Sequence, residues 1–177
     1  MNNIPQIKTI LYATDLGKFT RPVFRQAIAH ANVHKAKIIM LNVVEPLTET
    51  ARAIIAGYMP ETAIEEIQKD GMKNIIATMK ERVKKFCDEE CDGAGWEQIP
   101  LQDIIVVAGR PSEEILLAAE KYNADMIVMG QSSKKVMGSK VMGSSARRVA
   151  RLTKVPILIV TGNRCTCCTR SFIIFMS

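Results

Sequence analysis

Residues 126–145 read MIVMGQSSKKVMGSKVMGSS. The stretch starts with a short apolar run, continues from Gly130 to Ser145 as a loop of glycine, serine and lysine, and leads into a basic helical pattern that begins at Ala146. A short apolar run of this kind predicts a buried strand. A glycine-rich loop that enters a helix presents unpaired N–H groups at the positive end of the helix dipole. The stretch therefore predicts a strand, a loop and a helix that together hold phosphate.

Four more apolar runs are spaced along the chain and predict four more buried strands, at residues 8–13, 38–44, 104–108 and 156–160. Helical patterns separate them: one follows Thr20, a long one covers residues 61–90, one begins near Ser112 as the expected N-cap, and one covers residues 144–154. Strands that are apolar throughout and alternate with helices are typical of a parallel sheet covered on both faces. The predicted fold is a single doubly wound α/β sheet of five strands.

The long helical pattern carries an apolar stripe that we expect to pack in the core, formed by Ile64, Ile67, Ile75, Met79, Val83 and Phe86. Gly71 weakens its middle.

Charge is distributed unevenly in this chain of 177 residues, which has a net charge of +6. After Asp125 there are nine basic residues and no acidic one, which leaves 15 basic against 18 acidic residues before that point. A positive C-terminal part favours an anionic ligand, either a small phosphate compound or a nucleic acid. No apolar run approaches the ~20 residues that cross a bilayer, and the first residues do not resemble a signal peptide, so we expect a cytoplasmic protein.

The strand ends indicate where a ligand binds, because such sheets bind ligands beyond the carboxyl ends of their strands. Ala13, Thr14 and Asp15 end the first strand, Gly109 follows the third, and Gly130 follows the fourth. A carboxylate at Asp15 can accept hydrogen bonds from ribose hydroxyls while the loop holds phosphates. No Gly-Lys-Ser/Thr sequence occurs, and no G-x-G-x-x-G follows the first strand, which excludes a P-loop and disfavours a dinucleotide-binding domain.

The spacing Gly130-x2-Ser133-x9-Gly143-Ser144 resembles the G-x2-G-x9-G-Ser/Thr signature of the universal stress protein family, in its ATP-binding branch. Other blocks of the chain resemble that family in the same order: ILYATDL, LNVVEP, VVAGRPSEEIL, DMIVMG and VPILIV. The resemblance extends over residues 5–162. It implies a Rossmann-like fold of the adenine nucleotide alpha hydrolase type, with strand order 3-2-1-4-5.

The resemblance also implies a cofactor, ATP with Mg²⁺ or Mn²⁺, and residues that bind it. Asp15 would meet the ribose or the adenine edge, and the backbone around Val43 and Val44 would receive the adenine. The phosphate cradle would begin at Gly130, Ser132 and Ser133 and close at Gly143, Ser144 and Ser145. Ser133 stands where the signature has its second glycine, and its hydroxyl can donate to phosphate. A homodimer through the fifth strand and an unknown protein partner are also implied.

Catalytic residues are not assigned, since no Ser/His/Asp arrangement has a credible spacing. The leading hypothesis is a nucleotide-dependent switch or stress-response factor with at most slow ATP hydrolysis. The alternatives are a dimeric stress-response interaction protein without nucleotide, a slow ATPase or phosphotransfer enzyme, and a nucleic-acid binder, the last disfavoured by the lack of aromatic residues among the basic ones. His30 and His34 are four apart, a spacing that can share a metal, but we interpret them as surface histidines and assign no metal ligand.

The last residues, 163–177, form a cysteine-rich, apolar extension beyond the nucleotide-binding domain predicted for residues 1–162. Its Cys165, Cys167 and Cys168 can bind a soft metal or undergo oxidation, and we favour an incidental or redox-sensitive role.

Overall fold

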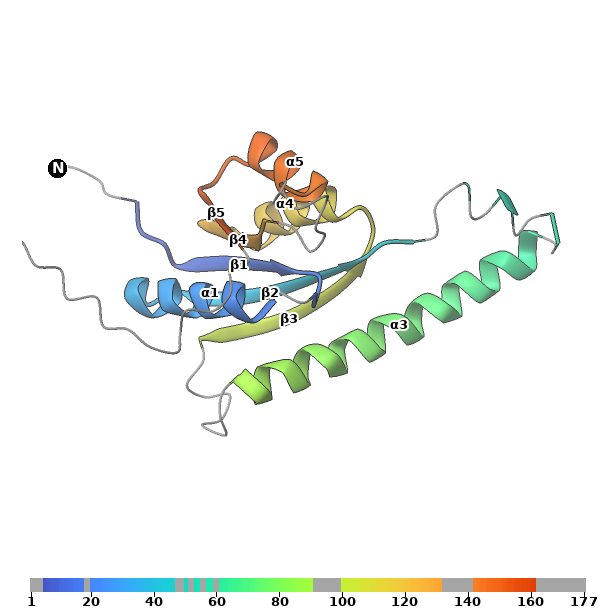
Figure 1. The fold of residues 1–177 in the computed structure, drawn as a ribbon, viewed down its shortest axis with the longest axis horizontal. Helices are drawn as coiled ribbons and strands as arrows, with labels where there is room; N and C mark the ends of the chain where they lie inside the picture. The colour runs from blue at the N-terminus through green and yellow to red at the C-terminus, as the bar shows by residue number, and fades with distance from the viewer. Residues whose placement is uncertain are drawn as a thin grey trace, which may run out of the picture.

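The computed structural model describes residues 5–17, 20–46, 50, 53–54, 57–58, 61–90, 100–131 and 142–161, without the side chains of residues 61–70, 72, 87 and 90. Five strands and four helices alternate along these residues: β1 Thr9–Thr14, α1 Thr20–His34, β2 Lys37–Val44, α3 Glu61–Glu90, β3 Leu101–Ala108, α4 Pro111–Lys121, β4 Met126–Gly130, α5 Ser144–Leu152 and β5 Ile157–Val160. All strand pairs are parallel, in the order β3-β2-β1-β4-β5 (Figure 1). The predicted fold and strand order are confirmed.

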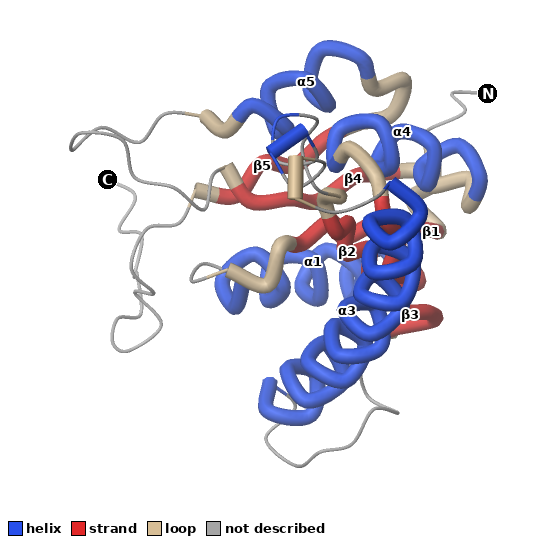
Figure 2. The backbone as a smooth tube through the Cα atoms, turned by 90° about the vertical axis from the view of Figure 1, so that its right-hand side faces the viewer, coloured by secondary structure: helices blue, strands red, loops and turns tan. Residues whose placement is uncertain are grey.

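Helices cover both faces of the sheet (Figure 2). Because side chains alternate along a strand, Ile10 and Tyr12 of β1 point towards α1 and α3, whereas Leu11 and Ala13 point towards α4 and α5. Tyr12, Phe24 and Phe86 form a row of rings on the first face, with neighbouring centroids 5.3 Å apart. The central strand β1 is thus buried on both faces, as the continuous apolar runs predict.

Helix α3 is longer than the sheet that it covers (Figure 1). Near its C-terminal end, Val83 is fully buried and Phe86 packs against the core. Farther towards the N-terminus, Ile75 is 45% exposed. The expectation that Ile75 lies in the core is therefore wrong, because α3 extends past the sheet at that point. The side chains of Ile64 and Ile67 lie outside the described part.

Helix α4 begins earlier than predicted. Its N-cap is Arg110 and its first residue is Pro111, while Ser112 lies within the first turn and is 8% exposed. Proline suits the first position of a helix because its φ is already helical and it has no N–H to leave unpaired. Strand β3 also begins at Leu101 rather than at 104, because it is an edge strand and the polar Gln102 and Asp103 are exposed there.

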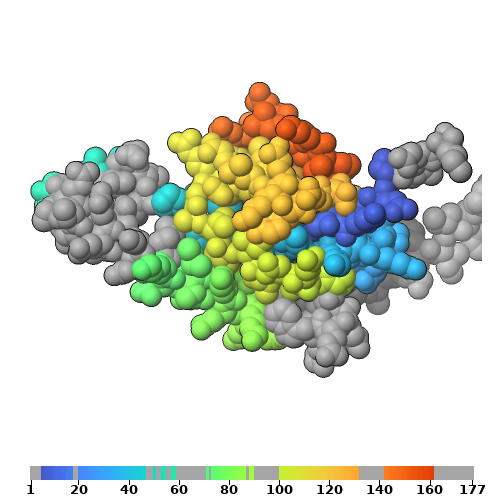
Figure 3. All heavy atoms as spheres, turned by 180° about the vertical axis from the view of Figure 1, so that it is seen from behind, coloured from blue at the N-terminus to red at the C-terminus, as the bar shows by residue number. Residues whose placement is uncertain are grey.

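One surface ion pair joins α4 to α5 and a second joins α4 to the segment that follows α5; the two helices lie side by side when the molecule is seen from behind (Figure 3). Arg148 lies 3.3 Å from Glu113, and Lys154 lies 2.8 Å from Glu120. The hydrogen bond between Lys154 and Glu120 lowers the pKa of Glu120 and raises that of Lys154. Exposed pairs such as these contribute little to stability, so α5 is held mainly through its buried Ala146 and Val149, which belong to the same apolar cluster as α4.

In the part of the chain that is described, no helix has the length and apolar character needed to cross a membrane.

Candidate functional site

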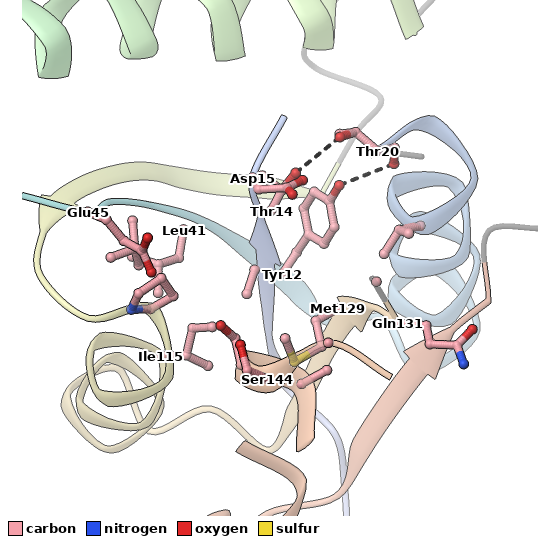
Figure 4. A pocket seen from close by; sticks show the side chains of 18 of the residues that line it. Tyr12, Thr14, Asp15, Thr20, Leu41, Glu45, Ile115, Met129, Gln131 and Ser144 are labelled. Atoms are coloured by element: carbon pink, nitrogen blue, oxygen red, sulfur yellow. Dashed lines mark hydrogen bonds between the residues drawn. The ribbon is translucent and has the colours of Figure 1, made fainter. Parts of the chain in front are cut away.

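A cavity of about 650 Å³ opens at the carboxyl ends of β1, β2 and β4 (Figure 4). Strand β1 lies beside β4 while β2 lies on its other side, so the strand order reverses here, where doubly wound sheets bind ligands. The volume is within the range of ordinary ligand pockets. Nine of the twelve residues predicted from the sequence line it: Ala13, Thr14, Asp15, Val43, Val44, Gly130, Gly143, Ser144 and Ser145.

Asp15 lies in a tight turn directly after β1. Its Oδ1 accepts the N–H of Gly17 at 2.9 Å, and Leu16 between them adopts a φ of 54°. A Cβ on Gly17 would lie only 2.9 Å from the same Oδ1. The hydrogen bond from Gly17 holds the carboxylate of Asp15 at the rim of the cavity, and a side chain at position 17 would displace that carboxylate.

Three hydroxyl groups line the cavity on the side of α1 (Figure 4). Tyr12 donates to the carbonyl of Thr20 at 3.2 Å, and Thr20 donates to the carbonyl of Gly17 at 2.8 Å. The hydroxyl of Thr14 lies 3.5 Å from that of Thr20. These bonds tie the start of α1 to the end of β1 and make this wall polar.

Asn42 supports the same strand end from the neighbouring strand. It is 2% exposed, and its Nδ2 donates to the carbonyl of Thr14 at 2.9 Å. Its Oδ1 is buried and has no hydrogen-bond partner among the residues that the structure describes. An unpaired buried oxygen costs about 1–3 kcal/mol. Asn42 thus lowers the stability of the fold by this amount, while its amide group fixes the carbonyl of Thr14, directly before Asp15.

The two ends of the glycine-serine loop meet at the cavity. The N–H of Gly143 donates to the carbonyl of Gln131 at 2.9 Å, and the N–H of Gln131 donates to the carbonyl of Val160. Gly130 and Gly143 are thereby brought to one site although 12 residues separate them. Ser132 and Ser133, predicted to start the phosphate cradle, lie outside the described residues.

Helix α5 begins at the cavity, on the side opposite Asp15 (Figure 4). Its N-cap is Gly143, which makes no side-chain cap hydrogen bond, and its first turn holds no acidic residue. The first backbone bond into the helix runs from the N–H of Arg147 to the carbonyl of Gly143 at 3.0 Å. The N–H groups that precede Arg147 have no acceptor within the helix, as at every helix start. This end of α5 therefore presents donors and a positive dipole to the cavity.

Gly109 is the one described residue of the predicted set that does not line the cavity. Its N–H donates to the carbonyl of Val44 at 3.0 Å, so it joins the end of β2 to the start of α4. The carbonyl of Val44 therefore already accepts a hydrogen bond within the protein. Gly109 contributes to the site by placing Pro111, which does line the cavity.

Sequence reasoning missed several residues of the lining. Met79 enters from α3, Ile115 from α4, and Glu45 follows β2 with a second carboxylate. Glu45 could have been found from its place after a strand end, like Asp15. Met79 and Ile115 carry no such signal, because only the packing of their helices brings them to the cavity.

Together, the fold and this cavity define a doubly wound α/β domain with a ligand pocket at its switch point. The model of the universal stress protein family matches residues 6–161, and the chain belongs to this family. A curated relative from Thermus aquaticus, the universal stress protein in the QAH/OAS sulfhydrylase 3' region, is 28% identical over 153 residues, which cover 86% of this chain and 98% of that protein.

Solved structures share the fold. The universal stress protein UspA from Lactobacillus plantarum matches with a TM-score of 0.69 at 18% identity, covering 89% of this chain and 99% of that one. A universal stress protein solved in complex with cAMP matches with a TM-score of 0.55 at 19% identity, covering 90% of this chain and all of that one.

Proposed function

We propose that this protein is an ATP-binding universal stress protein that acts as a nucleotide-dependent switch. The cavity would hold the nucleotide with its phosphates against the start of α5 and its ribose near Asp15. The observation that carries the proposal is the pairing of these two features across one cavity: uncapped N–H groups with no acidic residue beside them on one side, and a fixed carboxylate on the other.

The remaining lining suits the base. Leu41, Val43 and Ile115 give the cavity an apolar wall, as a purine requires. The complex of a related fold with cAMP supports an adenine nucleotide as the type of ligand. Magnesium prefers oxygen ligands and keeps several waters, so the phosphates of the nucleotide and water would hold Mg²⁺ near the start of α5.

The proposal includes a homodimer through β5. This strand is at the edge of the sheet, so its outer backbone groups have no neighbouring strand in the described chain. Pairing with a second copy would satisfy them. A protein partner would then sense whether nucleotide is bound, and we place this action in the cytoplasm. The extension at residues 163–177 is proposed to lie outside the nucleotide-binding domain of residues 1–162.

The test is to denature the purified protein, identify any released small molecules, and titrate the protein with ATP and Mg²⁺. We expect released adenine nucleotide, or binding of added ATP at or below millimolar concentration. Absence of both would overturn the proposal and favour a stress-response protein that acts without nucleotide. Binding of duplex DNA at physiological salt, weakened steeply by more salt, would favour the nucleic-acid alternative.

A weak ATPase is favoured by one specific observation, the second carboxylate at Glu45. A carboxylate can take a proton from water that attacks a phosphoryl group. We expect turnover that is slow and that Glu45→Gln lowers further without weakening ATP binding. Equal turnover by the parent protein and the Glu45→Gln variant would show that Glu45 has no catalytic role.

A further inference from the structure

The two histidines of the chain lie on one face of α1, His30 half-buried and His34 exposed. Their ring centroids are 6.4 Å apart, and the ring planes differ by 11°. Thr20 at the start of α1 lines the cavity, whereas His34 is the last residue of this helix of 15 residues. The pair is therefore about 15–20 Å from the proposed nucleotide site.

This arrangement is close to that of a metal-binding pair. Residues four apart on a helix are neighbours on its surface, and two histidines with this spacing can bind one metal ion through one nitrogen each. With metal–nitrogen bonds of about 2.1 Å, the two rings must approach to roughly 5–6 Å between centroids. The observed separation of 6.4 Å is close to this range, and the exposed ring of His34 can turn so that one nitrogen of each ring faces a shared ion.

We propose that His30 and His34 form a binding site for a divalent transition metal ion of the borderline class, with Cu²⁺ bound most tightly. Imidazole nitrogen suits copper, nickel and zinc, and affinities for such a site follow the order Co²⁺ < Ni²⁺ < Cu²⁺. Water completes the coordination of the ion, since the described residues contain no cluster of three or more histidine, cysteine or acidic side chains.

The segment of the chain that carries the pair offers no carboxylate for a hard cation. Residues 20–44 include no aspartate or glutamate, and Lys35 and Lys37 follow the helix directly. Mg²⁺ and Ca²⁺ require oxygen ligands and gain nothing from imidazole. The positive neighbours weaken the binding of every cation, so only an ion that forms strong bonds to nitrogen is held. The site is therefore separate in chemistry, as well as in position, from a magnesium-nucleotide site.

The test is calorimetric titration of the full chain with Ni²⁺ after removal of bound metal. The protein carries no added histidine tag, and its five cysteines are alkylated so that thiols do not compete. We expect one Ni²⁺ per chain. His30→Ala and His34→Ala should each raise the Kd at least about tenfold, because one of two coordinate bonds is lost. Cu²⁺ should bind more tightly than Ni²⁺, and Mg²⁺ should give no heat.

A relocation variant is the matched control. Asn32→His combined with His34→Ala keeps two histidines on α1 but places them two apart, where they do not face each other. It should bind Ni²⁺ as weakly as the single alanine variants, while circular dichroism shows the same helix content. A relocation variant that binds as tightly as the parent protein, or a parent protein that binds no Ni²⁺ at millimolar concentration, would overturn the proposal.

Discussion

Two helices, α4 and α5, begin beside the same cavity, and neither has a side-chain N-cap hydrogen bond. Their first turns differ. Helix α4 starts with Pro111 and carries Glu113 and Glu114, whose carboxylates already balance the positive end of its dipole. Helix α5 starts after Gly143 with two serines and has no acidic residue in its first turn.

The difference assigns different roles to the two helix ends. At the start of α4, the protein's own carboxylates already balance the positive end of the helix dipole, and Glu113 also pairs with Arg148 of α5. The start of α5 is left with unused donors that face the cavity. We therefore propose that an anionic ligand would bind at the start of α5, while α4 supplies part of the apolar wall through Ile115.

The largest effect is expected from making α5 resemble α4. Gly143 has φ −60° and ψ 155°, which any residue can adopt, and aspartate is a favoured N-cap. In Gly143→Asp the side chain caps the helix and its charge repels phosphate. At an effective dielectric constant of about 20, this repulsion is large enough to raise the Kd for ATP by about 100-fold or more. Calorimetry measures the Kd, and thermal unfolding should show stability unchanged or increased.

Gly143→Ala is the matched control, because it adds a methyl group without charge. It should weaken ATP binding less than the aspartate variant. If Gly143→Asp binds ATP as the parent protein does, the phosphates are not at α5.

A smaller effect is expected at the opposite side of the cavity. Asp15→Asn keeps an oxygen that can accept the N–H of Gly17 but removes the charge. A hydrogen bond to a charged group contributes about 1.5–3 kcal/mol, so the Kd for ATP should rise roughly tenfold or more. 2′-Deoxy-ATP or 3′-deoxy-ATP should lose less affinity for the variant than ATP does. Equal losses for all three nucleotides would mean that Asp15 does not contact the ribose.

Gly17→Ala should weaken ATP binding by several-fold, although Gly17 itself does not line the cavity. The new Cβ displaces the Asp15 carboxylate, which lies 2.9 Å from it. Gly71→Ala is the matched glycine control, because a Cβ at Gly71, within α3, meets no atom within 4 Å. That variant should gain about 0.5–1 kcal/mol of unfolding free energy and leave the Kd unchanged. Unaltered ATP binding by Gly17→Ala would show that the turn does not position Asp15 for the ligand.

The smallest effect is expected from neutralising α4. Glu113→Gln removes an exposed charge that solvent already screens and that pairs with Arg148. ATP affinity should change by less than about threefold, and any change should be towards tighter binding, since a negative charge is lost. A strong gain in affinity in calorimetry would indicate that phosphate binds at α4 instead.

Much of the site could be predicted because its parts are adjacent in the sequence. The run from Met126 through Gly130 to Ser144 is continuous, and a strand, loop and helix in that order place the loop at the strand's carboxyl end. Asp15 could be placed opposite the loop because it also follows a strand. Local sequence chemistry is sufficient where a site is built from strand ends.

The residues that were missed depend on packing between distant segments. Met79 reaches the cavity because α3 crosses that end of the sheet, and Ile75 is exposed because α3 extends beyond it. Neither outcome can be seen in the helical spacing, which is the same for buried and projecting turns. The N-cap of α4 was misplaced for a local reason: Pro111 starts the helix before the serine that was expected to cap it.

The most direct test of the central claim is to follow backbone amide resonances by NMR while ATP and Mg²⁺ are added. We predict that the largest shifts occur at Gly143, Ser144 and Ser145, with smaller ones at Asp15 and Gly130, and that Glu113 and Glu114 at the start of α4 move least. Largest shifts at the start of α4, or none at the start of α5 under saturating ATP, would contradict the account.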